Sequence, residues 1–212
     1  MPFIVLAFIT LMTFISPASG TGFDQAVERY KAKEFQIAFA EFYELANDEH
    51  ASAQVNLAIM FAKGQGVPQN DAHALYWAWR ARFSGASQAI PIIDYLTHKT
   101  IESDRIEIAK NLRFSYAARF ESGDETAALK MARTFNEVDK PRDPNLAYKW
   151  FTVAAAMDVQ YAMALRETLA LEILPEDRSR LQKNATETIN EWCRYRNGDR
   201  AICTNILLSA DS

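Results

Sequence analysis

The chain has few of the residues on which metal and thiol chemistry depend. Its 212 residues include only three histidines and two cysteines. His50, His73 and His98 each lack a second ligand at helical spacing, and the sequence contains no H-E-x-x-H, G-x-S-x-G or phosphate-binding glycine loop. We therefore expect no metal site, no cofactor and no catalytic residue.

The chain has no excess of positive charge. Lys and Arg number 23 against 27 Asp and Glu, which gives a net charge of -4, and no basic block interrupts the sequence. Because nucleic-acid binders neutralise phosphates with clustered Lys and Arg, this composition argues against a nucleic-acid partner. At 49% hydrophobic and 24% charged residues, the chain has the composition of a folded protein.

Long apolar runs are confined to the first residues. Phe3–Ile15 is almost wholly apolar, and Ser16–Gly20 then supplies a helix breaker and small residues before Thr21. This pattern is typical of a secretory signal peptide cleaved near Gly20. We expect the mature chain to lack a transmembrane segment and to be periplasmic or secreted. An uncleaved anchor is the alternative, because no charged side chain precedes the run.

The two cysteines, Cys193 and Cys203, lie on either side of the turn-forming sequence Asn197–Asp199. Their spacing is not that of a C-x-x-C redox motif, and no histidine lies nearby to complete a zinc site. In an oxidising compartment two such cysteines are expected to form a disulfide.

The sequence repeats itself over a long period. Ala53–Phe61 returns about 74 residues later as Ala127–Phe135. Further matches continue the pattern: Ala74–Trp77 with Ala147–Trp150, Asp104-Arg105 with Asp177-Arg178, and Lys110-Asn111 with Lys183-Asn184. The chain therefore contains two copies of one long unit, and such units stack and present surfaces more often than they house chemistry.

Apolar residues recur at helical spacing, and no alternating strand pattern of useful length is present, so we expect an all-α fold. Each copy is followed by additional helical sequence, at Ala89–Thr97 and Ser103–Arg119 in the first and at Ala162–Glu172 and Pro175–Trp192 in the second. We expect five segments: a signal peptide at 1–20, an N-terminal helical hairpin at 21–50, a first unit at 51–123, a second, degenerate unit at 124–197, and a disulfide-tied tail at 198–212.

Residues 51–89 resemble a Sel1-like repeat. The resemblance is carried by Ala53-Gln54, Asn56-Leu57, the loop Lys63–Asp71, and then Ala74, Trp77, Ala81 and Gly85. Residues 125–162 are similar but lack both loop glycines, so their turn should follow a different path. The resemblance implies a short right-handed α-solenoid of TPR-like hairpins with added helices, in which Trp77 and Trp150 belong to the core.

A second stripe lies opposite the core-facing side of the same helix. Tyr76, Trp79, Arg80 and Phe83 fall three or four residues apart, at positions that are usually charged in Sel1-like repeats. Either the added helices cover this stripe, or it is an exposed protein-binding surface. We take it as the candidate partner-binding site.

The resemblance implies a non-enzymatic adaptor that binds one or more partner proteins in the cell envelope, as part of signalling or of a flagellar or other envelope complex. Two alternatives stay open. One is a hydrolase that acts on cell-wall or β-lactam-like substrates on the same scaffold. The other is a structural spacer without a dedicated partner.

Overall fold

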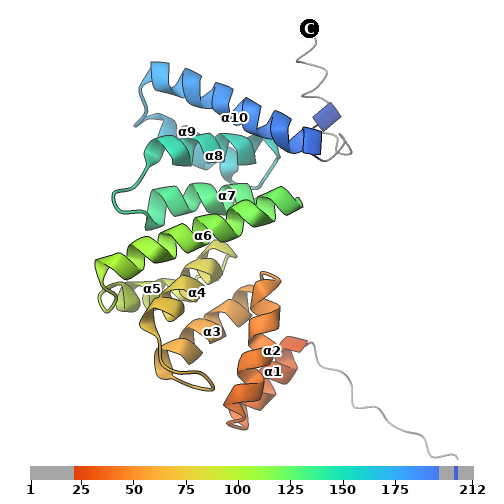
Figure 1. Ribbon diagram of the computed structural model, residues 1–212, viewed down its shortest axis with the longest axis vertical. Coiled ribbons are helices and arrows are strands. Elements are labelled where there is room, and N and C mark those ends of the chain that lie inside the picture. Colours follow the sequence, from red (N-terminus) through yellow and green to blue (C-terminus); the bar gives the residue numbers. More distant parts are fainter. Residues whose placement is uncertain (1–21, 196–202, 205–212) are drawn as a thin grey trace, which may run out of the picture.

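The computed structural model describes residues 22–195 and 203–204, so the expected signal peptide and most of the expected tail lie outside the described residues. The described part contains helices and no strand, which confirms the all-α expectation. Successive helices stack along one long axis as a short solenoid (Figure 1). In chain order they are α1 (Gly22–Lys31), α2 (Phe35–Asn47), α3 (Ala51–Lys63), α4 (Asp71–Phe83), α5 (Ala89–Thr97), α6 (Glu102–Ser122), α7 (Thr126–Arg133), the π-helix η1 (Thr134–Val138), α8 (Pro144–Ala156), α9 (Ala162–Ala170) and α10 (Pro175–Tyr195).

After the hairpin of α1 and α2, the helices form two units that match element for element. The first unit is α3 to α6, and the second is α7 with η1, followed by α8 to α10. Helices α4 and α8 both have 13 residues, α5 and α9 both have 9, and α6 and α10 both have 21. The added helices are therefore a regular part of each unit.

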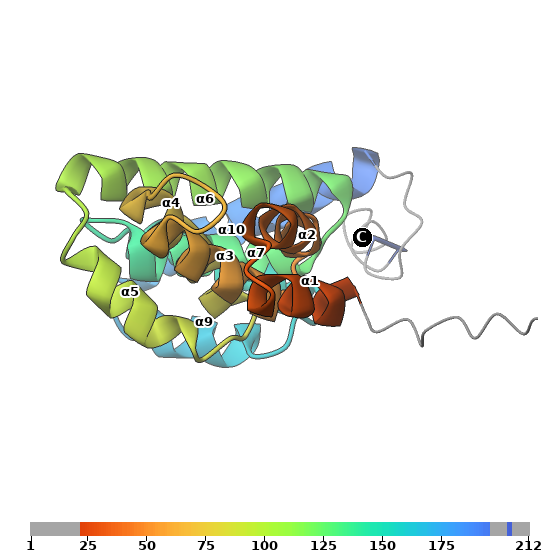
Figure 2. The ribbon, with the colours of Figure 1, turned by 90° about the horizontal axis from the view of Figure 1, so that it is seen from below.

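The added helices enclose the hairpins from two sides. Seen from below, the long helices α6 and α10 lie along one side of the stack and the short helices α5 and α9 along the other (Figure 2). Helices α3, α4 and α7 lie between them (Figure 2), and α8 contacts both α9 and α10. Each hairpin consequently buries more than the single face that an isolated amphipathic pair would bury.

The turn between α3 and α4 depends on glycine. Gly66 has a φ of +75°, and a Cβ atom there would lie 2.3 Å from the carbonyl oxygen of Phe35 in α2. No side chain fits this close approach. In the second unit the chain instead continues from α7 into η1, Thr134–Val138. The expectation of a different path for the second turn is confirmed.

Both turns nevertheless end in the same way. The side chains of Asn70 and Asp143 cap α4 and α8 by accepting hydrogen bonds of 2.9 Å from the backbone N–H groups of His73 and Leu146. Such caps satisfy backbone donors that have no partner within the helix. The second unit has thus changed its turn while keeping the start of its second helix.

Small residues let α3 and α4 approach closely. Ala53, Ala58, Ala74 and Ala81 have no exposed surface. Trp77 lies beside them with 3% of its surface exposed. A wide aromatic ring next to alanines fills the space that the small side chains leave between the helices.

Trp150, at the matching position of α8, has a different environment. It is only partly buried, and it packs edge-on against Phe120 of α6 with ring centroids 5.3 Å apart. The Lys149 ammonium lies 5.2 Å from the centroid of the same ring. Trp150 thus packs against the core, as expected, but from its margin, and part of its contact is with α6 rather than with its own hairpin.

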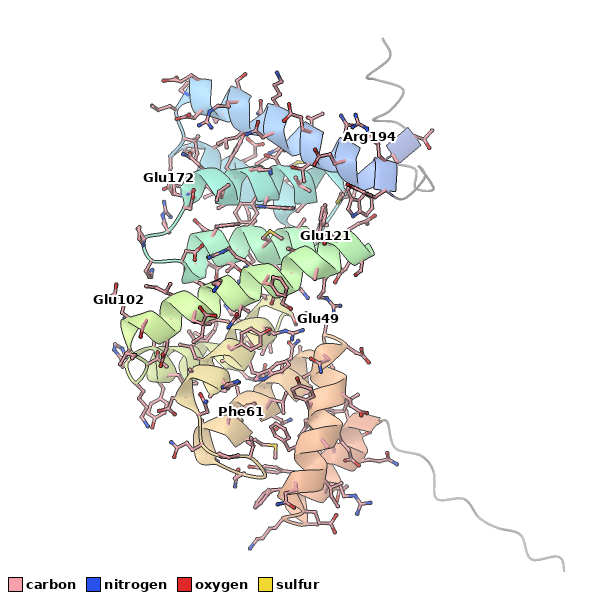
Figure 3. All side chains as sticks on the ribbon, in the orientation of Figure 1. Glu49, Phe61, Glu102, Glu121, Glu172 and Arg194 are labelled. Carbon is pink, nitrogen blue, oxygen red and sulfur yellow. A yellow bond between two sulfur atoms is a disulfide. The ribbon has the colours of Figure 1, made fainter. Side chains whose placement is uncertain are left out.

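A buried ionic cluster joins the N-terminal hairpin to both units. Glu49, in the turn between α2 and α3, accepts hydrogen bonds from Arg80 of α4, from Lys130 of α7 and, at 3.0 Å, from Ser84 Oγ. Arg119 Nε of α6 lies 3.8 Å from the same carboxylate. Burial raises the pKa of Glu49, but the charges of Lys130 and Arg80 outweigh burial and lower it to about 2. Figure 3 shows Glu49 at the junction of the hairpin with α6.

At the other end of the stack, Cys193 of α10 and Cys203 form a disulfide, which confirms the predicted bridge. Both cysteines are fully buried. No helix in the described ranges is long and apolar enough to cross a bilayer.

Candidate partner-binding groove

A groove lies between α4 and α6 of the first unit and is completed by residues of α2 and α3. It has a volume of about 560 Å³. Its lining consists of Tyr43, Phe61, Ala72, His73, Tyr76, Trp77, Asp104, Glu107, Ile108, Asn111, Phe114 and Ser115. The groove therefore combines Sel1-like hairpin residues with residues of the added helix α6.

Aromatic side chains form the floor. The Trp77 ring contacts Tyr43 of α2 and its neighbour Tyr76, with ring centroids 5.7 and 5.5 Å apart. Phe61 of α3, labelled in Figure 3, stacks on His73 at 5.1 Å. Tyr43 remains 44% exposed, so part of this packed aromatic surface is open to a ligand. Rigid aromatic surface of this kind is where binding free energy concentrates in protein interfaces.

The opposite wall is one face of α6. Asp104, Glu107, Asn111 and Phe114 recur at helical spacing and line the groove together. Phe114 is 77% exposed. The groove lining contains two carboxylates and neither a lysine nor an arginine. An apolar floor thus faces a negatively charged wall.

The four residues of the predicted partner-binding stripe do not form one exposed surface. Arg80 and Phe83 are buried, with 4% and 7% of their surfaces exposed. Tyr76 and Trp79 are partly buried, and of the four only Tyr76 lines the groove. Of the two alternatives for this stripe, coverage by neighbouring helices holds for Arg80 and Phe83.

This burial comes from the α2–α3 turn, from α7 and from the added helix α6. Arg80 is held by Glu49, and the Phe83 ring lies 6.2 Å from that of Tyr116 in α6. On the side of α7, the guanidinium carbon of Arg133 lies 4.5 Å from the Phe83 centroid. A helix that is covered on two sides needs apolar residues at positions that an isolated Sel1-like hairpin would expose.

Sequence alone gives no reason to single out Tyr43, Glu107 or Phe114. Tyr43 precedes the matched repeat, and the other two lie in an added helix that has no motif of its own. A signal was nevertheless available in the internal repeat. The aligned positions of α10 hold Arg180 and Glu187, so the two units differ in character there.

His50 has a structural role, and His98 lies on the surface. His50 Nδ1 accepts a hydrogen bond of 3.2 Å from the backbone of Ala53 and caps α3, while His98 is exposed after α5. Within the part of the chain that the structure describes, no three His, Cys, Asp or Glu side chains are grouped to hold a metal ion.

His73, Asp104 and Ser115 all line the groove, and this trio bears on the hydrolase alternative. Among residues 22–195, no hydrogen bond joins any two of these three side chains. A nucleophile and its base are recognised by such a bond, so the groove offers no observation in favour of hydrolysis.

Comparison with known proteins found similarity to one repeat family and to one solved structure. Residues 51–81 and 126–159 match the Sel1 repeat family. A crystal structure of a protective antigen from uropathogenic Escherichia coli strains, which displays an SLR fold, is similar at 16% sequence identity with a TM-score of 0.33. The similarity covers 77% of this chain, which spans 44% of the antigen's chain. No curated protein matches significantly.

The two family matches fall on corresponding parts of the stack. The first covers α3 and most of α4, and the second covers α7, η1 and α8. Each matched hairpin is followed by one short and one long added helix. The resemblance seen in the sequence is confirmed: the chain contains two Sel1 repeats, one in each unit.

Proposed function

We propose that this protein is a protein–protein interaction scaffold that holds a segment of a partner protein in the groove between α4 and α6. Sel1 repeats suggest such a scaffold, because stacked helical repeats present surfaces to partners. The observation that carries the proposal is Phe114, which is 77% exposed beside the aromatic floor of the groove. A large apolar side chain at the edge of a concave aromatic surface is characteristic of a site that a partner covers.

We further propose that the scaffold works in the periplasm or outside the cell, with a partner in the cell envelope. The disulfide between Cys193 and Cys203 fits an oxidising compartment. The apolar run Phe3–Ile15 and the small residues up to Gly20 support export. Amino-terminal sequencing of the chain recovered from its native cells should begin near Thr21. Recovery from the cytosol with Met1 intact would contradict the location.

Photocrosslinking from a residue that lines the groove should identify the partner. A photocrosslinking amino acid replaces Phe114, and in a matched chain it replaces Glu187, the aligned residue of α10. After irradiation of whole cells, mass spectrometry should identify a protein that is joined at position 114 and not at position 187. The purified partner should then bind the purified wild-type chain and bind Phe114→Ala at least about tenfold more weakly.

Other results select the alternatives. A spacer without a dedicated partner would give the same adducts, or none, at both positions. Turnover of a chromogenic β-lactam by the purified chain, with loss of turnover in a groove variant, would instead establish a hydrolase.

A further inference from the structure

The two units contain two versions of the same helix pair, and these versions differ in how their charges are satisfied. Helix α6 follows the hairpin of the first unit as α10 follows that of the second. Trp77, Asp104 and Asn111 of the groove have identical counterparts in the second unit. The second unit is therefore an internal reference for the positions that differ.

The first difference lies on the long helix. In α10, Asp177 forms an ion pair of 2.6 Å with Arg180. In α6 the same two positions hold Asp104 and Glu107. Two carboxylates three residues apart on one helix face repel each other, whereas the pair in α10 attracts. The first unit thus has an acidic pair where the second has an internally neutralised one.

Neither carboxylate of α6 is neutralised across the groove. Asp104 makes no ion pair with any residue in 22–195. Glu107 meets only Lys110 of its own helix, at 3.4 Å, and both of those side chains are more than half exposed. An exposed pair of this kind contributes little free energy, so Glu107 remains available to a ligand.

The second difference lies where the two helices face each other. Tyr76 of α4 and Phe114 of α6 correspond to Lys149 of α8 and Glu187 of α10. Burial lowers the pKa of Lys149, while the charges of Glu191 and Glu187 oppose that shift. The ammonium of Lys149 lies 5.2 Å from the centroid of the Trp150 ring, so the second unit has charged side chains at the two positions where the first unit has aromatic rings.

A hydrogen bond also joins the helices of the second unit. Gln182 of α10 donates to the Tyr148 hydroxyl of α8 at 3.0 Å. The aligned positions in the first unit hold Ala109 and Leu75, which have no polar side-chain atoms. The first unit therefore lacks both a counterpart of the Asp177–Arg180 pair and this polar contact at the groove.

We propose that the groove recognises a partner segment that places a Lys or Arg side chain beside an aromatic or large aliphatic side chain. This inference rests on the proposed scaffold function and names the chemistry of the partner. The cation pairs with Asp104 and Glu107, which find no cation in the groove lining. The apolar side chain packs on Phe114 and Tyr43, which are 77% and 44% exposed.

The dimensions of the groove suit a short peptide. Its wall on α6 runs from Asp104 to Ser115, which is roughly 17 Å along a helix axis. That length matches about five residues of extended chain. A glycan is the less favoured occupant, because Trp77, the widest ring in the floor, is 97% covered and offers almost no face for a sugar to stack on.

The proposal is tested with random peptides of about ten residues, longer than the groove, displayed on phage and selected on the purified full chain. Selected sequences should be enriched in a Lys or Arg next to an aromatic or large aliphatic residue. A synthetic copy of the best peptide should bind in a fluorescence anisotropy titration. Replacing its Lys or Arg by Gln should weaken binding about tenfold or more.

Matched variants assign the binding to the groove. Asp104→Asn with Glu107→Gln should weaken the peptide about tenfold, and ~0.5 M salt should weaken it in the wild type because the charges are exposed. Asp177→Asn with Arg180→Gln, the matched change in the second unit, should leave the affinity unchanged. All of these side chains are at the surface or near it, and equal melting temperatures would show that the variants are folded.

Three outcomes would overturn the inference. If selected peptides are neutral and apolar and need Phe114 but not Asp104 or Glu107, the scaffold function stands and the cationic partner is wrong. If no selected peptide is sensitive to Phe114→Ala, the groove is not a peptide site, and both proposals fail. If a glycan array gives ligands that need Phe114 while peptides give none, the occupant is a carbohydrate.

Discussion

Glu49, in the turn before α3, is paired with Lys130 of α7, which lies 81 positions further along the chain. The side chain of Glu49 is 13% exposed and that of Lys130 is 9% exposed. Arg80 of α4 completes the cluster from a third helix. One carboxylate therefore neutralises two buried cations that belong to different repeat units.

Removing this carboxylate should destabilise the whole chain. In Glu49→Gln, Arg80 and Lys130 lose their common anion, and breaking a buried pair of this kind costs about 3 to 5 kcal/mol. Glu34→Gln is the matched control, because its pair with Arg29 is 42% and 49% exposed and should contribute under about 1 kcal/mol. Urea unfolding of the two variants measures both changes. Equal urea midpoints for the two variants would show that the Glu49 cluster contributes no more to stability than the exposed pair of Glu34 with Arg29.

Glu49 should also make the free energy of unfolding depend on pH in the acid range. The pKa of Glu49 is lowered from 4.5 to about 2 in the folded chain, so the ionised carboxylate favours folding. This contribution, on the order of 3 kcal/mol, is fully present above about pH 5 and is lost as the pH falls from there to about 2. The difference in unfolding free energy between wild type and Glu49→Gln, measured from pH 7 to pH 2, should shrink over this range.

Asp124 titrates in the same acid range and must be separated from Glu49. Burial raises its pKa, but hydrogen bonds from Thr126 and Arg119 outweigh burial and lower it. Wild type and Glu49→Gln both contain Asp124, so its contribution cancels in the difference between their unfolding free energies. A difference that stays constant down to pH 2 would refute the role of Glu49.

Trp77 and Trp150 hold matching places in the repeat but should differ in their contribution to stability. Trp77 is 3% exposed among fully buried alanines, so Trp77→Ala should cost about 3 to 5 kcal/mol. Trp150 is only partly buried, and Trp150→Ala should cost clearly less. Thermal melting of both variants checks the order. A larger loss for Trp150→Ala would show that the contact with Phe120 dominates the second unit.

Two glycines with positive φ provide a further comparison. Gly66→Ala would place a Cβ 2.3 Å from the Phe35 carbonyl oxygen, so backbone must move. Gly85 has a φ of +98° and open space around it, so Gly85→Ala should cost only the strain of the left-handed conformation, about 1 to 2 kcal/mol. The unfolding free energy of Gly66→Ala should fall below that of Gly85→Ala. The opposite order would contradict the tight contact of this turn with α2.

The bridge between Cys193 and Cys203 should protect both thiols. The unfolded but unreduced mature chain should contain no reactive thiol, because each sulfur is bonded to the other. Replacing both cysteines by serine should lower stability by about 3 kcal/mol. Two free thiols in the untreated chain would exclude the bridge.

Local patterns in the sequence predict the helices well. The alanine spacing of α3 and α4, the caps at Asn70 and Asp143 and the long period all follow from interactions within a few residues or from repetition. The burial of Arg80 does not follow from such patterns. It depends on Glu49, which is 31 positions away and takes part through the packing of whole helices.

The groove could be predicted only in part for the same reason. Tyr76 and Trp77 lie in the recognisable hairpin, and Trp77 is marked by its place in the repeat. Phe114 and Tyr43 become neighbours of that hairpin through the placement of α6 and α2. The positions of Phe114 and Tyr43 in the sequence do not predict this placement. Only a comparison of the two aligned repeat units indicates that the position of Phe114 differs between them.

In stacked repeats each unit contacts only its neighbours, so long arrays can open one unit at a time. The cluster around Glu49 works against such independence. The N-terminal hairpin cannot separate without exposing Arg80 and Lys130 as unpaired cations, and one of these lies in the second unit. Unfolding of the N-terminal hairpin therefore also destabilises the second unit. The protein should unfold in a single cooperative transition.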